Sequence, residues 1–239
     1  MQTFDSAELD YISNLCERTE DFYPTSLLCI SGRDHNTSMT FGGNGCNAVY
    51  GYVYGGAASV ATAKGSHQLS DGGCFVANDK ALKVQALEST TRVFCFIRYG
   101  YRPLEMFSAI EHVGRLSYID GCSDTVLIPP PRAGDACLNH LHFPEGILQT
   151  QHIHPTVRIG LVVRGEGKAF CSDPGNSWSI DLKPGVAFVL VPQERHSFRT
   201  DLDGSSMDII AFHPDSNTGP TDDNHPMINR TYIRHGGGK

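Results

Sequence analysis

Two histidines placed two residues apart in an apolar segment constrain this chain more than any other feature. The segment Gln151–Arg158 reads QHIHPTVR, and the segment Arg164–Gly167 reads RGEG. Residues two apart in a β-strand point to the same face, so we expect His152 and His154 to share one side. A polar pair that faces a core is costly without a partner, and a transition metal is the commonest partner for imidazole. The pattern predicts a metal site on a strand, with hydrogen-bonded surface histidines as the alternative.

The spacing around these histidines resembles the first sequence motif of the cupin family. Five residues separate Gly146 from His152, one residue separates His152 from His154, and three residues lie between His154 and Arg158. Gly165 then follows after six residues. The family has Gly, His, His, Glu and Gly at these intervals, so Arg158 is the one departure.

A second segment resembles the cupin motif that supplies a third histidine. Lys183-Pro184-Gly185 opens it, and His196 lies eleven residues after Gly185, which is the family spacing. Pro192 is displaced by one position, Glu194 stands at the Gly position and Thr200 at the Asn position. Together the two motifs cover about 55 residues. The resemblance implies a cupin in which a metal is held by three residues, His152, His154 and His196.

An internal repeat lies upstream of these motifs. Gly51–Ala58 aligns with Gly160–Gly167, and Asp71–Val76 aligns with Lys183–Phe188. In this alignment the places of His152, His154, Arg158 and His196 are taken by Gly43, Gly45, Val49 and Val84. Because solenoid periods are much shorter, a repeat this long indicates two similar domains, the first without metal ligands. The alternative is a chance recurrence of glycine-rich turns in an all-β chain.

Length and composition are consistent with an all-β fold of two cupin barrels (double-stranded β-helix or jelly-roll) in one chain. The chain has 239 residues, enough for two ordinary domains, and its 25 Gly and 13 Pro are spread between short apolar runs. We expect an N-terminal degenerate barrel at 1–110, a connecting segment at 111–132, a metal-binding barrel at 133–214 and an extended tail at 215–239.

Two segments are expected to depart from the β pattern. Asp5–Glu8 resembles a capping box, which predicts a short N-terminal helix with Leu9, Ile12 and Leu15 on one side. A second helix or a bridging segment is expected over Leu104–Val113. Pro129-Pro130-Pro131 interrupts regular structure before the second barrel.

Charge, hydropathy and cysteine usage bear on the partners and the compartment. The net charge of −7 disfavours nucleic-acid binding, and no apolar run is long enough for a membrane helix. The eight cysteines lack CxxC spacing, and several lie in apolar runs, which predicts reduced core residues of a cytoplasmic protein. A secreted disulfide framework is the alternative. The expected partner is a small-molecule substrate, with a homodimer left open.

The resemblance also implies a range of metal chemistry. Three neutral imidazoles leave a divalent metal with its full charge and with open positions for substrate and oxygen, or substrate and water. Such sites resemble those of thiol dioxygenases and diketone-cleaving dioxygenases, so Fe(II) and an oxidoreductase are favoured. Other cupins use Zn, Mn or Ni in non-redox isomerases, lyases or cyclases, and some bind or sense ligands without turnover. Fold alone does not choose among these.

Arg158 is the candidate catalytic residue because it replaces the family's Glu. In an unbroken strand it would face inward with His152 and His154. A guanidinium about 6 Å from a divalent cation is repelled by roughly 5–6 kcal/mol at an effective dielectric near 20, so an anion should lie nearby. That anion is either a carboxylate or enolate of the substrate, or an acidic side chain such as Glu194 or Asp208 that swings Arg158 out of the pocket.

Four further residues are candidates for an additional ligand or for support of the ligands. Gln149 and Gln151 would face away from the metal in a regular strand, but a bulge could re-aim one of them. His140 and His142 repeat the HxH spacing in what we interpret as the preceding strand. Of the other histidines, those that fit no constellation, His213 among them, are interpreted as structural.

Overall fold

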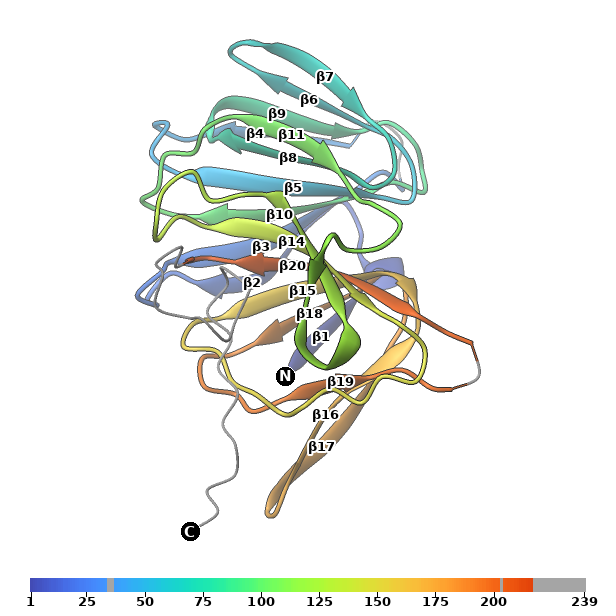
Figure 1. Ribbon diagram of the computed structural model, residues 1–239. Coiled ribbons are helices and arrows are strands. Elements are labelled where there is room, and N and C mark those ends of the chain that lie inside the picture. The colour runs from blue at the N-terminus through green and yellow to red at the C-terminus, as the bar shows by residue number, and fades with distance from the viewer. Residues whose placement is uncertain (34–36, 203, 217–239) are drawn as a thin grey trace. The chain divides into compact units, whose positions relative to one another are not determined.

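The computed structural model describes residues 1–33, 37–202 and 204–216, whose regular structure is almost all β-strand, joined by turns and loops (Figure 1). The all-β class predicted from the sequence is confirmed. The chain divides into two compact units. The C-terminal unit contains residues 1–3, 111–126 and the chain from Arg132 onward, and the N-terminal unit contains residues 4–110 and 127–131.

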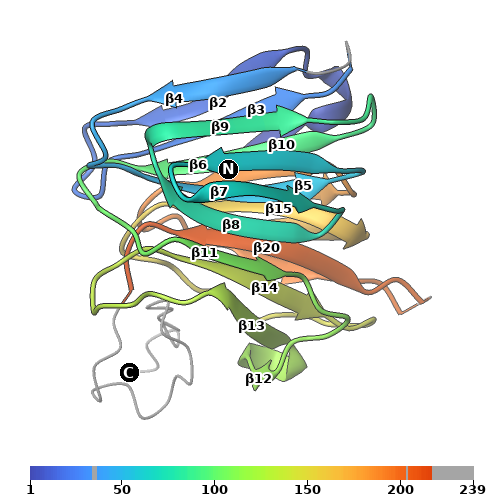
Figure 2. The same cartoon turned by 90° about the horizontal axis from the view of Figure 1, so that it is seen from above.

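The C-terminal unit contains a seven-stranded and a three-stranded sheet. The larger sheet has the order β1-β18-β15-β20-β14-β13-β12 and the smaller has the order β17-β16-β19. Figure 2 shows β14 between β20 and β13 in the larger sheet. The strands are β1 (Gln2–Asp5), β12 (Leu116–Ser117), β13 (Ser123–Ile128), β14 (Cys137–Phe143), β15 (Arg158–Gly165), β16 (Gly167–Asp173), β17 (Asn176–Leu182), β18 (Val186–Leu190), β19 (Ser197–Arg199) and β20 (Met207–His213).

The N-terminal unit contains a six-stranded sheet, β11-β8-β5-β10-β3-β2, and a four-stranded sheet, β4-β9-β6-β7. Its strands are β2 (Ile12–Arg18), β3 (Thr25–Ser31), β4 (Ser38–Gly42), β5 (Ala48–Tyr54), β6 (Ala58–Thr62), β7 (Gly65–Leu69), β8 (Gly73–Asn78), β9 (Lys80–Ala86), β10 (Arg92–Arg98) and β11 (Met106–Ala109).

Each unit has its own hydrophobic core, and both of its sheets contribute to that core. In the C-terminal unit the core takes alternate residues of the large sheet, such as Leu141, Phe143 and Ile209, together with Ala169 and Phe198 of the small sheet. This alternation follows from the two-residue period of a strand, which places every second side chain on the buried face. The same large-sheet face that builds the core therefore also presents side chains to the pocket described below.

The order of paired strands is repeated between the two units. The sheet order β11-β8-β5-β10-β3-β2 corresponds to the order β1-β18-β15-β20-β14-β13, and β7-β6-β9 corresponds to β17-β16-β19. The edge strands differ in connectivity, because β11 follows β10 in the chain whereas β1 precedes all the other strands. Gly51 lies opposite Phe75 in the first sheet, and Gly160 lies opposite Phe188 in the second. A Cβ atom would come within 1.9 Å of the Phe75 ring at Gly51 and within 2.1 Å of the Phe188 ring at Gly160. The matched glycines thus make room for the matched phenylalanines.

The hydrogen bonds refine the sequence alignment of the repeat by one residue. Gly72 has φ +83° and donates its N–H to the Val53 carbonyl at 2.9 Å. Gly185 has φ +87° and donates its N–H to the Val162 carbonyl at 2.8 Å. Gly72 rather than its neighbour therefore corresponds to Gly185, because this left-handed turn needs glycine in both units.

The predicted N-terminal helix is wrong. Asp5 does accept a hydrogen bond from the Ala7 N–H at 2.9 Å, but only one turn of 3₁₀ helix (Ser6–Glu8) follows, and Leu9 is already extended. Ile12–Arg18 forms β2 instead, paired with β3. A helix of three turns is marginal by itself, whereas the ladder satisfies the backbone groups of both strands.

The second helical alternative, over Leu104–Val113, is also wrong. Met106–Ala109 forms β11, which pairs antiparallel with β8. Of the predicted connecting segment, residues 111–126 belong to the C-terminal unit and residues 127–131 to the N-terminal unit. In the predicted tail, Asp215 and Ser216 are buried and the remaining residues lie outside the described part of the chain.

Two further sequence predictions concern the cysteines and the membrane. All eight cysteines are free, and six of them are buried, as expected for core residues. The described helical segments are single turns and are too short to cross a bilayer.

Candidate metal centre

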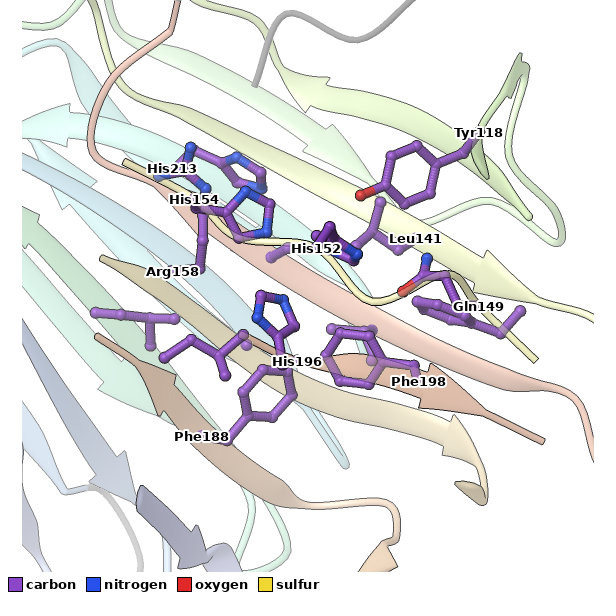
Figure 3. Close-up of a pocket in the computed structure, with 16 residues that line it drawn as sticks. Tyr118, Leu141, Gln149, His152, His154, Arg158, Phe188, His196, Phe198 and His213 are labelled. Atoms are coloured by element: carbon purple, nitrogen blue, oxygen red, sulfur yellow. The ribbon is translucent and has the colours of Figure 1, made fainter. Parts of the chain in front are cut away.

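The structure brings His152, His154 and His196 together in the C-terminal unit. Their potential ligand atoms all lie within 4.8 Å of one another. The ring centroids are 4.5 Å apart for His152 and His196, 5.0 Å for His152 and His154, and 5.1 Å for His154 and His196. All three side chains are buried and face one another in the pocket (Figure 3).

The backbone around His152 is an isolated bridge rather than the unbroken strand that we expected. The N–H of His152 donates to the carbonyl of His196 at 2.9 Å, and the reverse bond is 3.0 Å long. The neighbouring bridge pairs Leu148 with Arg199. Between the two bridges the first segment advances by four residues, from Leu148 to His152, whereas the second advances by only three, from His196 to Arg199. This extra residue is a β-bulge, and it shifts the alternation of side chains before His152.

Hydrogen bonds select the ring nitrogens that face the centre. Nδ1 of His152 lies 2.9 Å from the Thr150 carbonyl, and Nδ1 of His196 lies 2.8 Å from the Glu194 carbonyl. A carbonyl oxygen can only accept, so each Nδ1 carries the proton and each Nε2 keeps a lone pair. The His196 Nε2 and the His154 Nδ1 are buried without a partner among the described residues. Buried lone pairs on converging imidazoles are what a transition metal requires.

Burial also keeps the histidines ready to bind a metal. Desolvation, with a smaller contribution from Arg158, holds the pKa of His154 well below its usual value. Desolvation and the neighbouring His152 do the same for the pKa of His196. These imidazoles are therefore neutral at pH 7, and a metal does not have to displace protons from them.

The three histidines line a pocket whose walls are mainly apolar. Apolar walls with a few converging polar side chains are typical of a site for a small organic ligand. Its lining residues are Tyr118, Leu141, Phe143, Gln149, His152, His154, Arg158, Ile159, Gly160, Phe188, Leu190, His196, Phe198, Ile209, Ala211 and His213.

Arg158 faces this pocket and is also paired with an acidic residue. It begins β15, is buried, and its Nη1 donates to Oδ1 of Asp215 at 3.3 Å and to the Val157 carbonyl at 2.9 Å. Thr156 bridges the same two side chains through its hydroxyl. Burial lowers the pKa of Arg158 and Asp215 raises it, but a guanidinium stays charged in a protein. The sequence thus identified the need for a nearby anion but not Asp215.

The acidic residues expected beside Arg158 are engaged elsewhere. Oε2 of Glu194 accepts a hydrogen bond from the Val191 N–H at 3.0 Å. Asp208 binds His140 Nε2 at 2.9 Å and His142 Nδ1 at 2.7 Å through one oxygen, and Arg164 through the other. The even-numbered residues of β14 and β20 face away from the pocket, so His140 and His142 do not join the histidine cluster.

The two glutamines differ in their placement. Gln149 was expected to face away from the metal, but the bulge turns its side chain into the pocket. Oε1 of Gln151 instead accepts the Ser172 N–H at 2.7 Å, outside the pocket. Only Gln149 of the four additional candidates therefore lines the site.

Sequence reasoning missed two polar residues of the pocket, Tyr118 and His213. His213 ends β20, and its ring lies 6.5 Å from that of His154. Its signal was present in the sequence, because Ile209, Ala211 and His213 alternate along one apolar strand and so share a face. Tyr118 precedes a turn in the loop before β13 and has no comparable pattern.

The equivalent positions of the N-terminal unit are apolar. The pairing of β6 with β9 matches the pairing of β16 with β19, and in this match Leu82 corresponds to His196. Leu82 pairs with Phe41, and His196 pairs with His152. Phe41 therefore corresponds to His152. Phe41 and Leu82 are both buried in the core. They, rather than Gly43 and Val84, occupy the places of metal ligands. Among the described residues no second cluster of three metal-ligating side chains occurs.

A buried carboxyl in the large sheet, on β13, is expected to make stability depend on pH. Desolvation raises the pKa of Asp124 to about 7, against smaller opposing effects of hydrogen bonds from Asn139 and Thr125. Asn139 Nδ2 donates to Asp124 Oδ2 at 2.7 Å, while Oδ1 of each side chain is buried without a partner in the described structure. A proton on Asp124 would give this pair a second donor, so the folded protein favours the neutral acid.

We therefore expect the Asp124→Asn variant to be more stable than the wild type at high pH. The stability that the raised pKa provides is complete below pH 3.8 and is lost as pH rises through about 7. The loss amounts to about 4 kcal/mol when the carboxylate is forced to ionise. Urea unfolding at pH 5 and pH 8.5 measures the difference between variant and wild type. A difference that does not grow with pH would contradict a raised pKa.

Comparisons with solved structures identify the fold. No model of a known protein family matches the chain, and no curated protein sequence matches it. A cupin 2 conserved barrel domain protein from Leptotrichia buccalis matches with TM-score 0.61 and 13% identity over 88% of this chain and 95% of that one. The protein Ylba from E. coli matches with TM-score 0.62 and 14% identity over 89% and 90%.

A variant of oxalate decarboxylase from Bacillus subtilis also matches, with TM-score 0.53 and 10% identity over 88% of this chain and 76% of that one. That enzyme has Mn(II) centres. The chain has the cupin fold, and the likeness extends over most of its length. Its three-histidine cluster could hold a metal ion, as the resemblance to the two cupin motifs implies.

Proposed function

We propose that this protein is a metal-dependent cupin enzyme that acts on a small organic acid or carbonyl compound. The observation that carries the proposal is the convergence of three buried imidazoles on one mainly apolar pocket. His152, His154 and His196 would hold the metal, with Nε2 of His152 and His196 facing it. Bound there, a divalent ion would act as a Lewis acid and would offer open positions to substrate and to oxygen or water.

The charges around the cluster favour an anionic oxygen on the substrate. Imidazole binds a metal as a neutral ligand, so three histidine ligands would leave the charge of the ion uncompensated. The carboxylate of Asp215 offsets the positive charge of Arg158, and this weakens the repulsion between the guanidinium and a bound metal ion. We propose that Arg158, on the pocket wall beyond His154 in Figure 3, meets the acidic group of the substrate. A carboxylate or enolate would then be held by Arg158 at one end and by the metal at the other.

Within this class we favour a non-haem Fe(II) dioxygenase, an oxidoreductase. Imidazole ligands suit iron, and an apolar pocket protects reactive species from water. A non-redox isomerase, lyase or cyclase with Zn, Mn or Ni is the second candidate, because the same Lewis acid stabilises an enolate without oxygen. A binding or sensory protein is a third.

Metal analysis and oxygen uptake separate these candidates. The protein is purified anaerobically, its metals are measured, and oxygen consumption is followed with a small β-diketone and with a small aliphatic thiol. Iron near one ion per chain with uptake on either compound is the expected result. Zinc, manganese or nickel without uptake would favour the non-redox enzyme, and a metabolite recovered unchanged from the purified protein would favour the sensor.

We also propose that the chain is a two-cupin protein with a metal in the C-terminal barrel alone. The repeated strand order and the matched Gly51–Phe75 and Gly160–Phe188 pairs support two barrels. Phe41 and Leu82 support the absence of a metal from the first.

Metal stoichiometry tests this asymmetry. We expect about one ion per chain after equilibration with excess Fe(II) or Zn(II) and mild chelation, because an apolar pair offers no lone pairs to a metal. A stoichiometry near two that survives the chelator would contradict the proposal.

A further inference from the structure

Gln149 places a hydrogen-bond acceptor in the pocket that the protein itself does not satisfy. The residue is only 3% exposed, and its Oε1 is buried without a partner in the described residues. Buried polar atoms are nearly always hydrogen-bonded, and an acceptor left unsatisfied destabilises the folded state. One that persists at the wall of a binding pocket indicates a donor on the ligand.

The orientation of this amide is held by its surroundings. The Gln149 N–H donates to the Phe198 carbonyl at 3.0 Å, and the hydroxyl of Ser197 donates to the Gln149 carbonyl. Its Nε2 faces the sulfur of Cys122 at 4.0 Å. Burial raises the pKa of that thiol to about 12, so the sulfur remains a neutral, weak acceptor. With the backbone held on both sides and Nε2 directed at sulfur, Oε1 stays in the pocket.

Gln149 and Arg158 occupy different ends of the pocket. Figure 3 shows Gln149 and Tyr118 on one side of the histidines, and Arg158 and His213 on the other. Besides the three histidines, the lining of the pocket includes the apolar side chains of Leu141, Phe188 and Phe198. A ligand that satisfies both ends carries a polar group at each and an apolar body between them.

The chemistry of the amide favours a contact with substrate over a role as fourth ligand. Amide oxygens suit hard ions such as Ca²⁺ and Mg²⁺, whereas a cluster of imidazoles selects transition metals. A neutral acceptor in an apolar wall is instead well suited to select a hydroxyl group, because a substrate without that group leaves the acceptor unsatisfied.

We propose that Gln149 is a specificity-determining residue that accepts a hydrogen bond from a substrate hydroxyl. The substrate class is then a hydroxylated, mainly apolar acid or carbonyl compound whose acidic oxygen meets the metal. This inference rests on the proposed metal-dependent function of the same pocket.

The test compares binding of benzoate, 3-hydroxybenzoate and 4-hydroxybenzoate to the Co(II)-loaded protein, followed through the visible Co(II) spectrum. We expect one hydroxybenzoate to bind the wild type about tenfold more tightly than benzoate, the effect of about one hydrogen bond. Gln149→Met has nearly the same volume but no acceptor and should lose this preference while its Kd for benzoate is unchanged. Gln151→Met is the matched control, because Gln151 already bonds to Ser172 outside the pocket, and it should behave as the wild type.

A second measurement tests Gln149 without metal or ligand. Gln149→Met should raise the Tm of the metal-free protein, because an unsatisfied buried oxygen is replaced by an apolar group. A purely structural role would lower the Tm.

Three results would overturn the inference. In the first, the wild type binds all three probes equally or binds none of them. In the second, Gln149→Met keeps the preference for a hydroxybenzoate. In the third, Gln149→Met loses Co(II), which would make Gln149 a metal ligand. A wild type that takes up no Co(II) would instead contradict the proposed function, and the inference with it. The metal-free Tm still reports on Gln149 in that case.

Discussion

Replacement of His196 by Ala is expected to reduce bound metal from about one ion per chain to below about a tenth of that after dialysis against metal-free buffer. Two imidazoles would remain, and loss of even a hydrogen-bond partner of a ligand typically weakens metal binding about 10- to 100-fold. The fold should survive, since the core of the C-terminal unit consists of packed apolar strands. Elemental analysis and Tm of the same preparation measure both effects, and His152→Ala and His154→Ala should behave alike.

His112→Ala is the matched control for this prediction, because His112 is an exposed histidine of the same unit. Its metal content should equal that of the wild type. If His196→Ala retained full occupancy, the assignment of the third ligand would be wrong. His213 would then become the candidate, since its ring is 6.5 Å from that of His154, whereas His140 and His142 are bound to Asp208.

Replacement of Asp215 by Ala is expected to destabilise the protein by about 3–5 kcal/mol. Asp215 is fully buried and pairs with Arg158, so its removal leaves a guanidinium charge in the interior without its counter-ion. The Tm should fall by about 6–20 °C for a chain of this size. Asp181→Ala is the control, because Asp181 pairs with Lys168 on the surface and its removal should leave the Tm nearly unchanged.

A double variant separates the structural role of this pair from a role in substrate binding. Arg158→Met with Asp215→Leu replaces the ion pair by apolar side chains and should recover most of the lost stability. If Arg158 also contacts the substrate anion, kcat/KM should remain about 10- to 100-fold lower in the stable double variant. Recovery of both stability and kcat/KM would leave Arg158 with a structural role alone.

The HxH pair and the resemblance to the two cupin motifs predicted which three side chains converge. These residues lie near one another because motif spacing reflects strand and turn lengths, which are local properties of the chain. The matched glycines of the repeat were equally visible, since a left-handed turn or a ring against the backbone admits little else. The sequence did not reveal the acidic partner of Arg158, because Asp215 is 57 residues away and reaches it through tertiary packing.

Local patterns failed where pairing between segments overrode them. Asp5–Glu8 has a helix-capping pattern, but the segment after it is held by β3 as a strand. The alternation of side chains along a regular strand predicted that Gln149 faces away from the metal. One extra residue in the segment that pairs with β19 shifts this alternation, so the side chain of Gln149 faces the pocket.

The sequence by itself determined the all-β class, the cupin resemblance and the three histidines, because these depend on residue type and on short, regular spacing. Tertiary structure alone decided the neighbours of those histidines: Asp215 beside Arg158, Asp208 beside His140 and His142, and Gln149, Tyr118 and His213 in the pocket. Such contacts depend on strand register and on a single bulge. A shift of one residue reverses every side chain of a strand, so the pocket could be assigned only once the register was known.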